Sequence, residues 1–229
     1  MMTDAIGRFP APARWLEGIH LARVKSVQDP DAKGRVQVQL LGPDPDGDAL
    51  IWARVAVPYA GDHFGAFLLP DVGQEVIVAF PSGDTASPIV VGALWNGATA
   101  LPETLGGDHV DRWSLTGKNG TRIAIVEESN GQEKVEISTP AGAKATLTDA
   151  SGGEMKIEVA GNTVKLNPSG VSIETPGKCD VQASQVSVTA STVSVSAAMS
   201  TFSGIVKCDT LITNSVISSS YTPGAGNVW

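Results

Sequence analysis

Residues 18–95 alternate between apolar and polar positions in five short stretches. Each stretch has the two-residue period of a strand with one buried face, and none has the 3.6-residue period of an amphipathic helix. Gly, Pro and Asp between the stretches favour turns. The predicted strands are GIHLARVKSV (18–27), GRVQVQLLG (34–42), LIWARVAVP (50–58), GQEVIVAFP (73–81) and SPIVVGALW (87–95). Five short antiparallel strands of this kind predict a small Greek-key barrel of the OB type.

Certain positions in these strands are expected to fill the core of the barrel. Because side chains alternate along a strand, the apolar set should point inward. The predicted core residues are Trp52, Val55, Val76, Val78 and Phe80. Two glycines, Gly73 and Gly83, lie where the turns require a positive φ, which glycine adopts without steric cost. We assign all of these residues to the fold and none to catalysis.

A different pattern begins at residue 121, where a unit of the form apolar–x–apolar recurs. Nine such units start at intervals of 12, 10 and 12 residues, and then of 7, 7, 8, 7 and 7 residues. The units are IAI (123–125), VEI (135–137), ATL (145–147), IEV (157–159), VKL (164–166), VSI (171–173), CDV (179–181), VSV (186–188) and VSV (193–195). A seven-residue period is also typical of coiled coils, but the Leu-rich seam and flanking charges of a coiled coil are missing.

The parity of the pattern favours short strands joined by corners. Apolar residues lie at 186, 188 and 190 and then at 193, 195 and 197, so the alternation slips by one position. A single flat strand cannot slip in this way, because its side-chain period is two. Repeated strands and corners predict a β-helix, whose thin turns need neighbours to bury their apolar side. Three identical chains around one axis would provide that burial.

Composition supports a narrow core in the C-terminal part. Aromatic residues make up only 5% of the chain, and residues 161–229 hold six of its 40 charged residues. Small β-branched side chains fit a narrow three-chain core in which large rings would not fit. Ser and Thr on the outside keep the surface of the predicted β-helix hydrophilic. The predicted needle core consists of Val171, Ile173, Val181, Val186, Val188, Val193 and Val195.

Charge and hydropathy exclude several classes of function. The formal net charge is −8, and residues 17–95 carry ten acidic and five basic groups, so a basic groove for single-stranded nucleic acid is excluded. No apolar run approaches the roughly 20 residues of a membrane span, and the N-terminus lacks the apolar core of a signal peptide. We therefore expect a soluble protein made in a reducing cytoplasm. Cys179 and Cys208 are expected to be buried as small apolar side chains.

The sequence offers no convincing catalytic or metal site. The three histidines, His20, His63 and His109, have no second His or Cys at ligand spacing. An acidic cluster of Glu127, Glu128, Glu133 and Glu136 is assigned to a solvated turn and strand edge. We expect no enzyme activity and no cofactor.

One long motif carries a resemblance to a known family. KGRVQVQLLG…IWARVAVPYAG…GAFLLPDVGQEVIVAFPSGDTASPIVVGALWNG (33–97) resembles the barrel domain of the phage baseplate-V and VgrG spike proteins, with every block in order. The resemblance implies a homotrimeric central spike of a contractile injection machine, located in the baseplate of an assembled particle. It also implies a baseplate hub protein and a PAAR-type tip protein as partners, a tube or effector cargo, and contact with the target membrane on piercing.

On this basis the chain is expected to divide into six segments. They are an N-terminal tether (1–16), an OB barrel that binds the hub (17–97), a linker (98–116), a β neck (117–160), a triple-stranded β-helix needle (161–217) and a C-terminal cap (218–229). The cap leaves the repeat at turn-forming residues. We expect Tyr221, Pro223, Asn227 and Trp229 to dock the tip protein.

The alternative is a β-helical tail fibre, adhesin or polysaccharide-binding tailspike. Such a fibre should carry an aromatic-lined carbohydrate groove, whereas residues 161–228 offer only Phe202 and Tyr221. The sequence leaves open whether the particle is a phage, a secretion system or a free injection device.

Overall fold

The computed structural model describes residues 18–42 and 49–220 of the 229-residue chain. The chain divides after Gly177 into two units, and each is described by itself below. The first unit contains a closed barrel and a seven-stranded sheet. The fold is therefore all-β with a barrel at its N-terminal side, as predicted.

The barrel consists of five strands, and each lies within one of the five predicted stretches. They are β1 (Ile19–Ser26), β2 (Val36–Leu40), β3 (Leu50–Val55), β6 (Glu75–Ala79) and β7 (Ile89–Leu94), closed in the order β1-β2-β3-β7-β6. The expectation of purely antiparallel pairing is wrong at one place, because β3 and β7 pair in parallel. The chain between residues 56 and 88 returns to the end of β3, where Ile89 and Val90 at the start of β7 pair with Arg54 and Val55 in the same direction.

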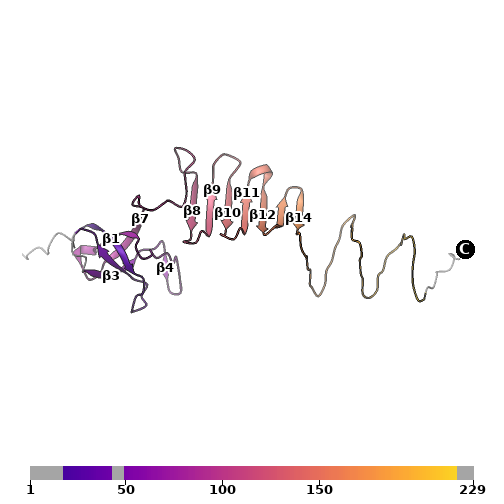
Figure 1. Cartoon of the computed structure of the whole chain (residues 1–229), viewed down its shortest axis with the longest axis horizontal. Helices are drawn as coiled ribbons and strands as arrows, with labels where there is room; N and C mark the ends of the chain where they lie inside the picture. Colours follow the sequence, from indigo (N-terminus) through magenta and orange to yellow (C-terminus); the bar gives the residue numbers. More distant parts are fainter. Residues whose placement is uncertain (1–17, 43–48, 221–229) are drawn as a thin grey trace, which may run out of the picture. The chain divides into compact units, whose positions relative to one another are not determined.

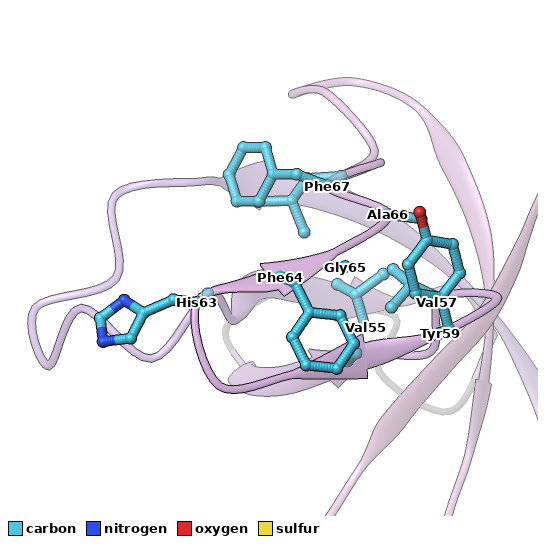
Figure 2. Close-up of a pocket in the computed structure, with 11 residues that line it drawn as sticks. Val55, Val57, Tyr59, His63, Phe64, Gly65, Ala66 and Phe67 are labelled. Atoms are coloured by element: carbon cyan, nitrogen blue, oxygen red, sulfur yellow. The ribbon is translucent and has the colours of Figure 1, made fainter.

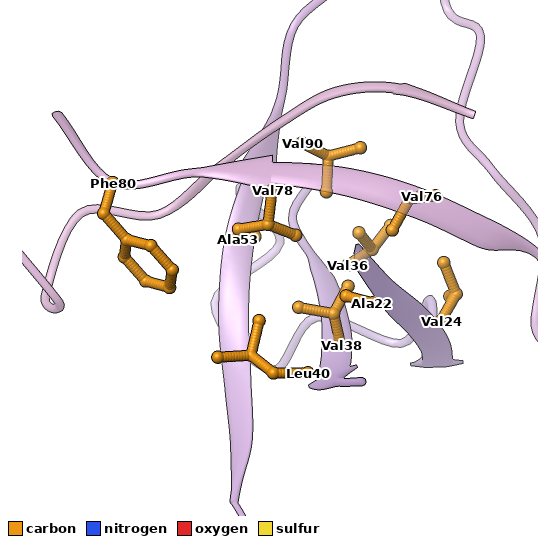
Figure 3. Close-up of a cluster of buried hydrophobic side chains, with 10 residues drawn as sticks. All are labelled: Ala22, Val24, Val36, Val38, Leu40, Ala53, Val76, Val78, Phe80 and Val90. Atoms are coloured by element: carbon orange, nitrogen blue, oxygen red, sulfur yellow. The ribbon is translucent and has the colours of Figure 1, made fainter. Parts of the chain in front are cut away.

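The barrel core is built from small branched side chains (Figure 3). Its buried members are Ala22, Val24, Val36, Val38, Leu40, Ala53, Val76, Val78, Phe80 and Val90. Three of the predicted core residues, Val76, Val78 and Phe80, are buried, and Val55 is partly buried against the cluster. Because the interior holds mostly Val and Ala, the barrel is narrow.

The inward assignment of Trp52 is wrong. On β3 the inward positions are Ile51, Ala53 and Val55, so Trp52 lies on the opposite side of the strand. Its ring is covered by Arg35, whose guanidinium carbon lies 5.7 Å from the ring centroid. A cation over an aromatic face is a favourable arrangement at a surface. Residues 52 and 55 are three positions apart and lie on opposite sides of an alternating strand, so Trp52 and Val55 could not both point inward.

The turns of the barrel follow the sequence. Gly73 and Gly83 have φ values of 89° and 75°, as expected. Between β3 and β6 a short hairpin, β4 (Ala60–Gly61) and β5 (Phe64–Gly65), projects from the barrel. A 3-10 turn, η2 (Pro81–Gly83), connects β6 to β7.

The seven-stranded sheet is an antiparallel meander in which each strand pairs with its neighbours in sequence (Figure 1). Its strands are β8 (Arg112–Thr116), β9 (Arg122–Val126), β10 (Lys134–Ser138), β11 (Lys144–Thr148), β12 (Glu154–Val159), β13 (Asn162–Asn167) and β14 (Gly170–Glu174), with a 3-10 turn, η3 (Ala150–Gly152), before β12. The first six apolar–x–apolar units all lie in these strands. The sheet continues past residue 160 to Glu174, where a β-helix was expected.

The tight loops explain the seven-residue spacing in this part of the sheet. Ala160 and Gly161 join β12 to β13 with φ values of 49° and 83°. Positive φ at both central residues is typical of a type I′ hairpin, whose two-residue loop matches the twist of the strands. The strands β12, β13 and β14 begin eight residues apart, and the apolar–x–apolar units within them begin at residues 157, 164 and 171 without forming a helix of strands.

The second unit contains no strand within its described residues, 178–220. The backbone instead runs between regularly spaced bends, seen as a zigzag in Figure 1. The bends lie at Ser184, Ser191, Ala198, Gly204, Asp209, Asn214 and Ser219. They are seven residues apart at first and five residues apart at the end.

Candidate functional site

The most extensive functional feature is an exposed apolar face on the seven-stranded sheet. The strand register aligns the apolar residues of neighbouring strands in two continuous rows, which we call the apolar rows. One row is Trp113, Ile125, Val135, Leu147, Met155, Leu166 and Val171, and the other is Leu115, Ile123, Ile137, Ala145, Ile157, Val164 and Ile173. Side chains directly opposite each other in a sheet are in contact, so each row is a continuous strip.

The apolar rows are largely exposed within the first unit. Twelve of their fourteen side chains are 40–69% exposed. Contiguous apolar patches larger than a few hundred square ångströms are rare on monomeric soluble proteins and mark interaction sites. Exposed apolar rows of this continuity are typical of an interaction surface.

The opposite face of the sheet is polar and partly covered by the chain itself. Glu103 belongs to residues 98–111, which we call the strap, and its carboxylate accepts a hydrogen bond from Arg122 Nε at 2.6 Å. Arg122 also reaches Glu136 on β10 at 3.0 Å. Between these pairs, Ala124 and Val126 are buried. The strap thus covers the first strands of the sheet on the side away from the apolar rows.

A second group of ion pairs holds the end of the strap. Asp111 is 5% exposed, and its two carboxylate oxygens accept hydrogen bonds from Arg112 at 2.8 and 2.9 Å. Arg112 donates a further hydrogen bond to Glu128 at 2.8 Å. The hydrogen bonds from Arg112 lower the pKa of Asp111 to about 2. This carboxylate stays charged at neutral pH and fixes the chain where it enters β8.

The assignment of the acidic cluster to a solvated edge is wrong for Glu136. Burial alone would raise the pKa of this carboxyl, but Lys144, Lys134 and Arg122 outweigh burial and lower it. The hydrogen bond from Arg122 likewise lowers the pKa of Glu103. Strand register brings these charges together from β9, β10 and β11, which the spacing of the acidic residues could not reveal.

The predicted needle core residues lie in two places. Val171 and Ile173 belong to β14 and end the apolar rows. The remaining five lie in the second unit, before its first bend or between its first three bends, and are largely exposed in the single chain: Val181, Val186, Val188, Val193 and Val195. Cys179 and Cys208 are also exposed as free thiols in this chain, so their expected burial is wrong for the isolated chain.

The backbone of the second unit shows the same lack of partners. The N–H and C=O groups of residues 178–220 form no hydrogen bonds to backbone groups of other described residues. Backbone polar groups that are buried must be paired, and an unpaired strand is a template for another chain. Both the side chains and the backbone of this segment therefore have capacity for intermolecular contacts.

An aromatic groove on the barrel was not predicted. Tyr59, Phe64 and Phe67 surround a cavity of about 430 Å³ beside the β4–β5 hairpin (Figure 2). The ring of Phe64 lies against Gly61, where an added Cβ would be 2.2 Å from the ring. Tyr59 and His63 carry the only polar side chains in this lining. The cluster YAGDHFGAF (59–67) could have drawn attention to it.

Sites of other kinds are not found in the described part of the chain. No three His, Cys, Asp or Glu side chains among residues 18–42 and 49–220 come together in a group that could hold a metal ion. His20 packs edge-on against Phe80 at 5.5 Å. Across the same residues no helix is long and apolar enough to cross a bilayer. The predicted tip-docking residues Tyr221, Pro223, Asn227 and Trp229 lie outside the described residues.

Comparison with known proteins identifies the barrel. Residues 20–95 match the type VI secretion system/phage-baseplate injector OB domain, which confirms the resemblance inferred from the motif at 33–97. Over 112 residues the chain is 33% identical to the type VI secretion system spike protein VgrG4b of Pseudomonas aeruginosa, and the alignment covers 46% of this chain and 14% of that protein. The spike protein VgrG5 of the same organism is 33% identical over 113 residues, again with 46% and 14% covered.

Relatives in a second organism carry similar names. The spike protein VgrG3 of Vibrio cholerae is 33% identical over 88 residues, which are 37% of this chain and 9% of that protein. A Vibrio cholerae protein described as the actin cross-linking toxin VgrG1 is 39% identical over 54 residues, or 24% of this chain and 5% of the toxin. The alignments thus span a small part of each relative, and the chain is similar to VgrG-type spike proteins over less than half of its own length.

Proposed function

We propose that this protein is the central spike of a contractile injection machine and acts as a homotrimer. The observation that carries the proposal is the continuity of the apolar rows, which run across all seven strands of the sheet and remain exposed in the single chain. The injector OB domain and the spike relatives support the same function. The apolar surface requires a partner, and a second and third copy of the chain provide matching surfaces.

In the proposed trimer, the seven-stranded sheets of the three chains turn their apolar rows toward a common axis. The polar face, with the strap and its ion pairs, then faces solvent. This arrangement removes the apolar rows from water, at a gain of roughly 25 cal/mol per Å² of apolar area. It also leaves the salt bridges of the polar face at the solvent-exposed surface, where they need no partner from another chain.

In the needle, three copies of residues 178–220 intertwine. The backbone groups that lack partners within one chain pair with the neighbouring chains, and the predicted core valines pack around the axis. An obligate assembly of this kind has no stable folded monomer of the needle. The exposed Cys179 would then lie among the core residues.

The proposed role is mechanical. The barrel attaches the spike to a baseplate hub protein, the C-terminal segment carries a PAAR-type tip protein, and tube or effector cargo travels with the assembly. Contact with the target membrane occurs on piercing. No nucleic acid, cofactor or catalytic step enters this function. The protein is made in the bacterial cytoplasm and acts in the baseplate of the assembled particle.

A pair of neighbouring substitutions tests the needle. Val188→Asp places three carboxylates at the axis, where an unpaired buried charge costs several kcal/mol per chain. Ser187→Asp places the same charge on the outside. We expect multi-angle light scattering to give a trimer for the wild type and for S187D, and to show strong loss of trimer for V188D.

A compact wild-type monomer of 23.6 kDa in light scattering would refute the trimeric spike. Equal trimer yields for V188D and S187D would leave the trimer standing but contradict the inward position of Val188. Thermal unfolding followed at several protein concentrations separates these cases further, because the midpoint of an obligate trimer rises with concentration.

A further inference from the structure

Three asparagines of the chain are followed directly by glycine, and the structure holds them in different ways. They are Asn96, Asn119 and Asn130, and all three are exposed. Asparagine is a chemically labile residue. It is most labile before glycine, because glycine has no Cβ to keep its backbone nitrogen away from the asparagine side chain. The hydrogen bonds around each pair therefore decide which asparagine can react in the folded protein.

At Asn96 both ends of the side-chain amide are occupied. Its Nδ2 donates a hydrogen bond to Glu75 Oε2 at 3.2 Å, and its Oδ1 accepts one from the backbone N–H of Ala98 at 3.1 Å. The amide is thus held away from the nitrogen of Gly97.

At Asn119 it is the following nitrogen that is occupied. The N–H of Gly120 closes a turn by donating a hydrogen bond to the carbonyl of Gly117 at 2.8 Å. This hydrogen bond must break before the nitrogen can approach the side chain of Asn119.

Asn130 is restrained by neither kind of contact. It lies between β9 and β10 in a turn that is closed by the N–H of Gln132, which donates to the carbonyl of Ser129 at 3.1 Å. The nitrogen of Gly131 is therefore not the closing donor, and it donates to no backbone carbonyl among the described residues. Within the same part of the chain the side chain of Asn130 forms no hydrogen bond.

A carboxylate lies beside the free nitrogen. Contacts with the backbone N–H groups of Glu133 itself and of Gly131 lower the pKa of the Glu133 carboxyl. Glu133 is therefore charged at neutral pH, and a charged carboxylate beside a reacting N–H group can accept its proton.

We propose that Asn130 is a site of spontaneous deamidation in the folded protein, with Glu133 as the proton acceptor. The nitrogen of Gly131 forms a bond to Cγ of Asn130 while its proton passes to Glu133. The bond from Cγ to Nδ2 then breaks, and the amide nitrogen takes up that proton and leaves as ammonia. Water opens the resulting succinimide at either of its carbonyls, which gives aspartate or isoaspartate.

The reaction adds a negative charge to a loop that already carries Glu127, Glu128 and Glu133. Isoaspartate also lengthens the backbone of the loop by a methylene group. Asn130 belongs neither to the apolar rows nor to the salt bridges of the polar face, so we expect the sheet to stay folded after the change. The proposal goes beyond the injection function and does not depend on it.

The test follows the three sites in parallel in the purified full-length protein, kept at neutral pH for several weeks. Trypsin places Asn130 in the peptide 123–134, where it is the only asparagine, and mass spectrometry measures its conversion. We expect Asn130 to convert about fivefold or more faster than Asn96 and Asn119, because a hydrogen bond of ordinary strength protects each of the other two. In protein unfolded by urea the three rates should approach one another, because these contacts are lost.

Two variants identify the reacting groups. Asn130→Gln keeps an amide at this position but moves it away by one methylene, and it should remove most of the label that an isoaspartyl methyltransferase places on the intact protein. The matched control, Asn119→Gln, should leave the label nearly unchanged. Glu133→Gln should slow the conversion of Asn130 several-fold and leave that of Asn119 as it is.

The remaining outcomes contradict the proposal. Absence of conversion at Asn130, or a label that persists in N130Q, would show that this asparagine is not the site. The same order of rates in folded and unfolded protein would show that the local sequence, and not the structure, ranks the three sites. Conversion of Asn130 at the wild-type rate in E133Q would show that Glu133 does not accept the proton.

Discussion

At the scale of single residues, the barrel shows how closely burial follows strand parity. Val90 and Val91 are neighbours on β7, yet Val90 is buried in the core whereas Val91 is exposed. The same parity places Trp52 outside beneath Arg35. A residue's position in the pleat, rather than its size or hydropathy, decides whether it belongs to the core.

The neighbouring valines give a matched pair of substitutions. Val90→Ala removes two methyl groups from the packed interior and should lower the free energy of unfolding by about 2 kcal/mol through lost transfer energy and the cavity left behind. Val91→Ala should change it by less than about 0.5 kcal/mol. Urea unfolding followed by tryptophan fluorescence measures both. Similar losses for the two variants would contradict the orientation of β7.

At the scale of elements, the ion pairs of the strap make the stability of the sheet depend on pH. The pKa values of Glu103, Glu136 and Asp111 are lowered in the folded chain. A carboxyl with a lowered pKa binds a proton more readily in the unfolded state than in the folded state. Its contribution to the free energy of unfolding is therefore complete above its ordinary pKa near 4, and this contribution is lost as the pH falls through the pKa of the folded state. For Asp111 the folded value is about 2. Stability should therefore fall between about pH 4 and pH 2.

Replacement of Glu103 tests the strap. Glu103→Gln weakens the charged hydrogen bond with Arg122 and should cost about 1 kcal/mol at neutral pH, with a smaller further loss on acidification than the wild type shows. The control is Glu127→Gln, since Glu127 is exposed and forms no salt bridge within the described residues. Thermal unfolding at pH 7 and pH 3 measures the difference. An equal response of both variants would show that the strap does not support the sheet.

The elements also show what the sequence could and could not predict. The barrel strands, their turns and the positive φ of Gly73 and Gly83 followed from local patterns, because parity and turn chemistry are properties of short segments. The seven-residue spacing was ambiguous. In residues 154–174 it comes from hairpins with two-residue loops, whereas in residues 178–199 it comes from bends without pairing. Both arrangements repeat the same apolar–x–apolar unit, so the pattern alone cannot distinguish them.

Features that depend on register were beyond the sequence. Arg122, Glu136 and Lys144 meet because β9, β10 and β11 pair in a particular alignment. The aromatic groove requires the β4–β5 hairpin to bring Tyr59 and Phe67 to one side. The apolar rows were predictable as separate units, and only the pairing showed that they are continuous.

At the scale of the whole molecule, the proposed spike separates assembly from tip binding. Most of the predicted core lies before residue 218, and the predicted docking residues lie after it. Deletion of residues 218–229 should therefore leave the trimer of residues 1–217 largely intact in light scattering, and it should abolish co-purification with a PAAR-type tip protein. If a truncated spike still retained the tip protein, residues 218–229 would serve only as a cap and not as the docking site.

The spacing of the bends has a further consequence for such a spike. Bends seven residues apart give way to bends five residues apart after Gly204. In a three-sided rod the distance between bends sets the length of each side, at about 3.3 Å per residue, so the sides shorten to about 0.7 of their length and the cross-section to about half. An axial thrust transmitted along the rod is then carried by about half the area, and the pressure at the narrow end is about doubled without any increase in force.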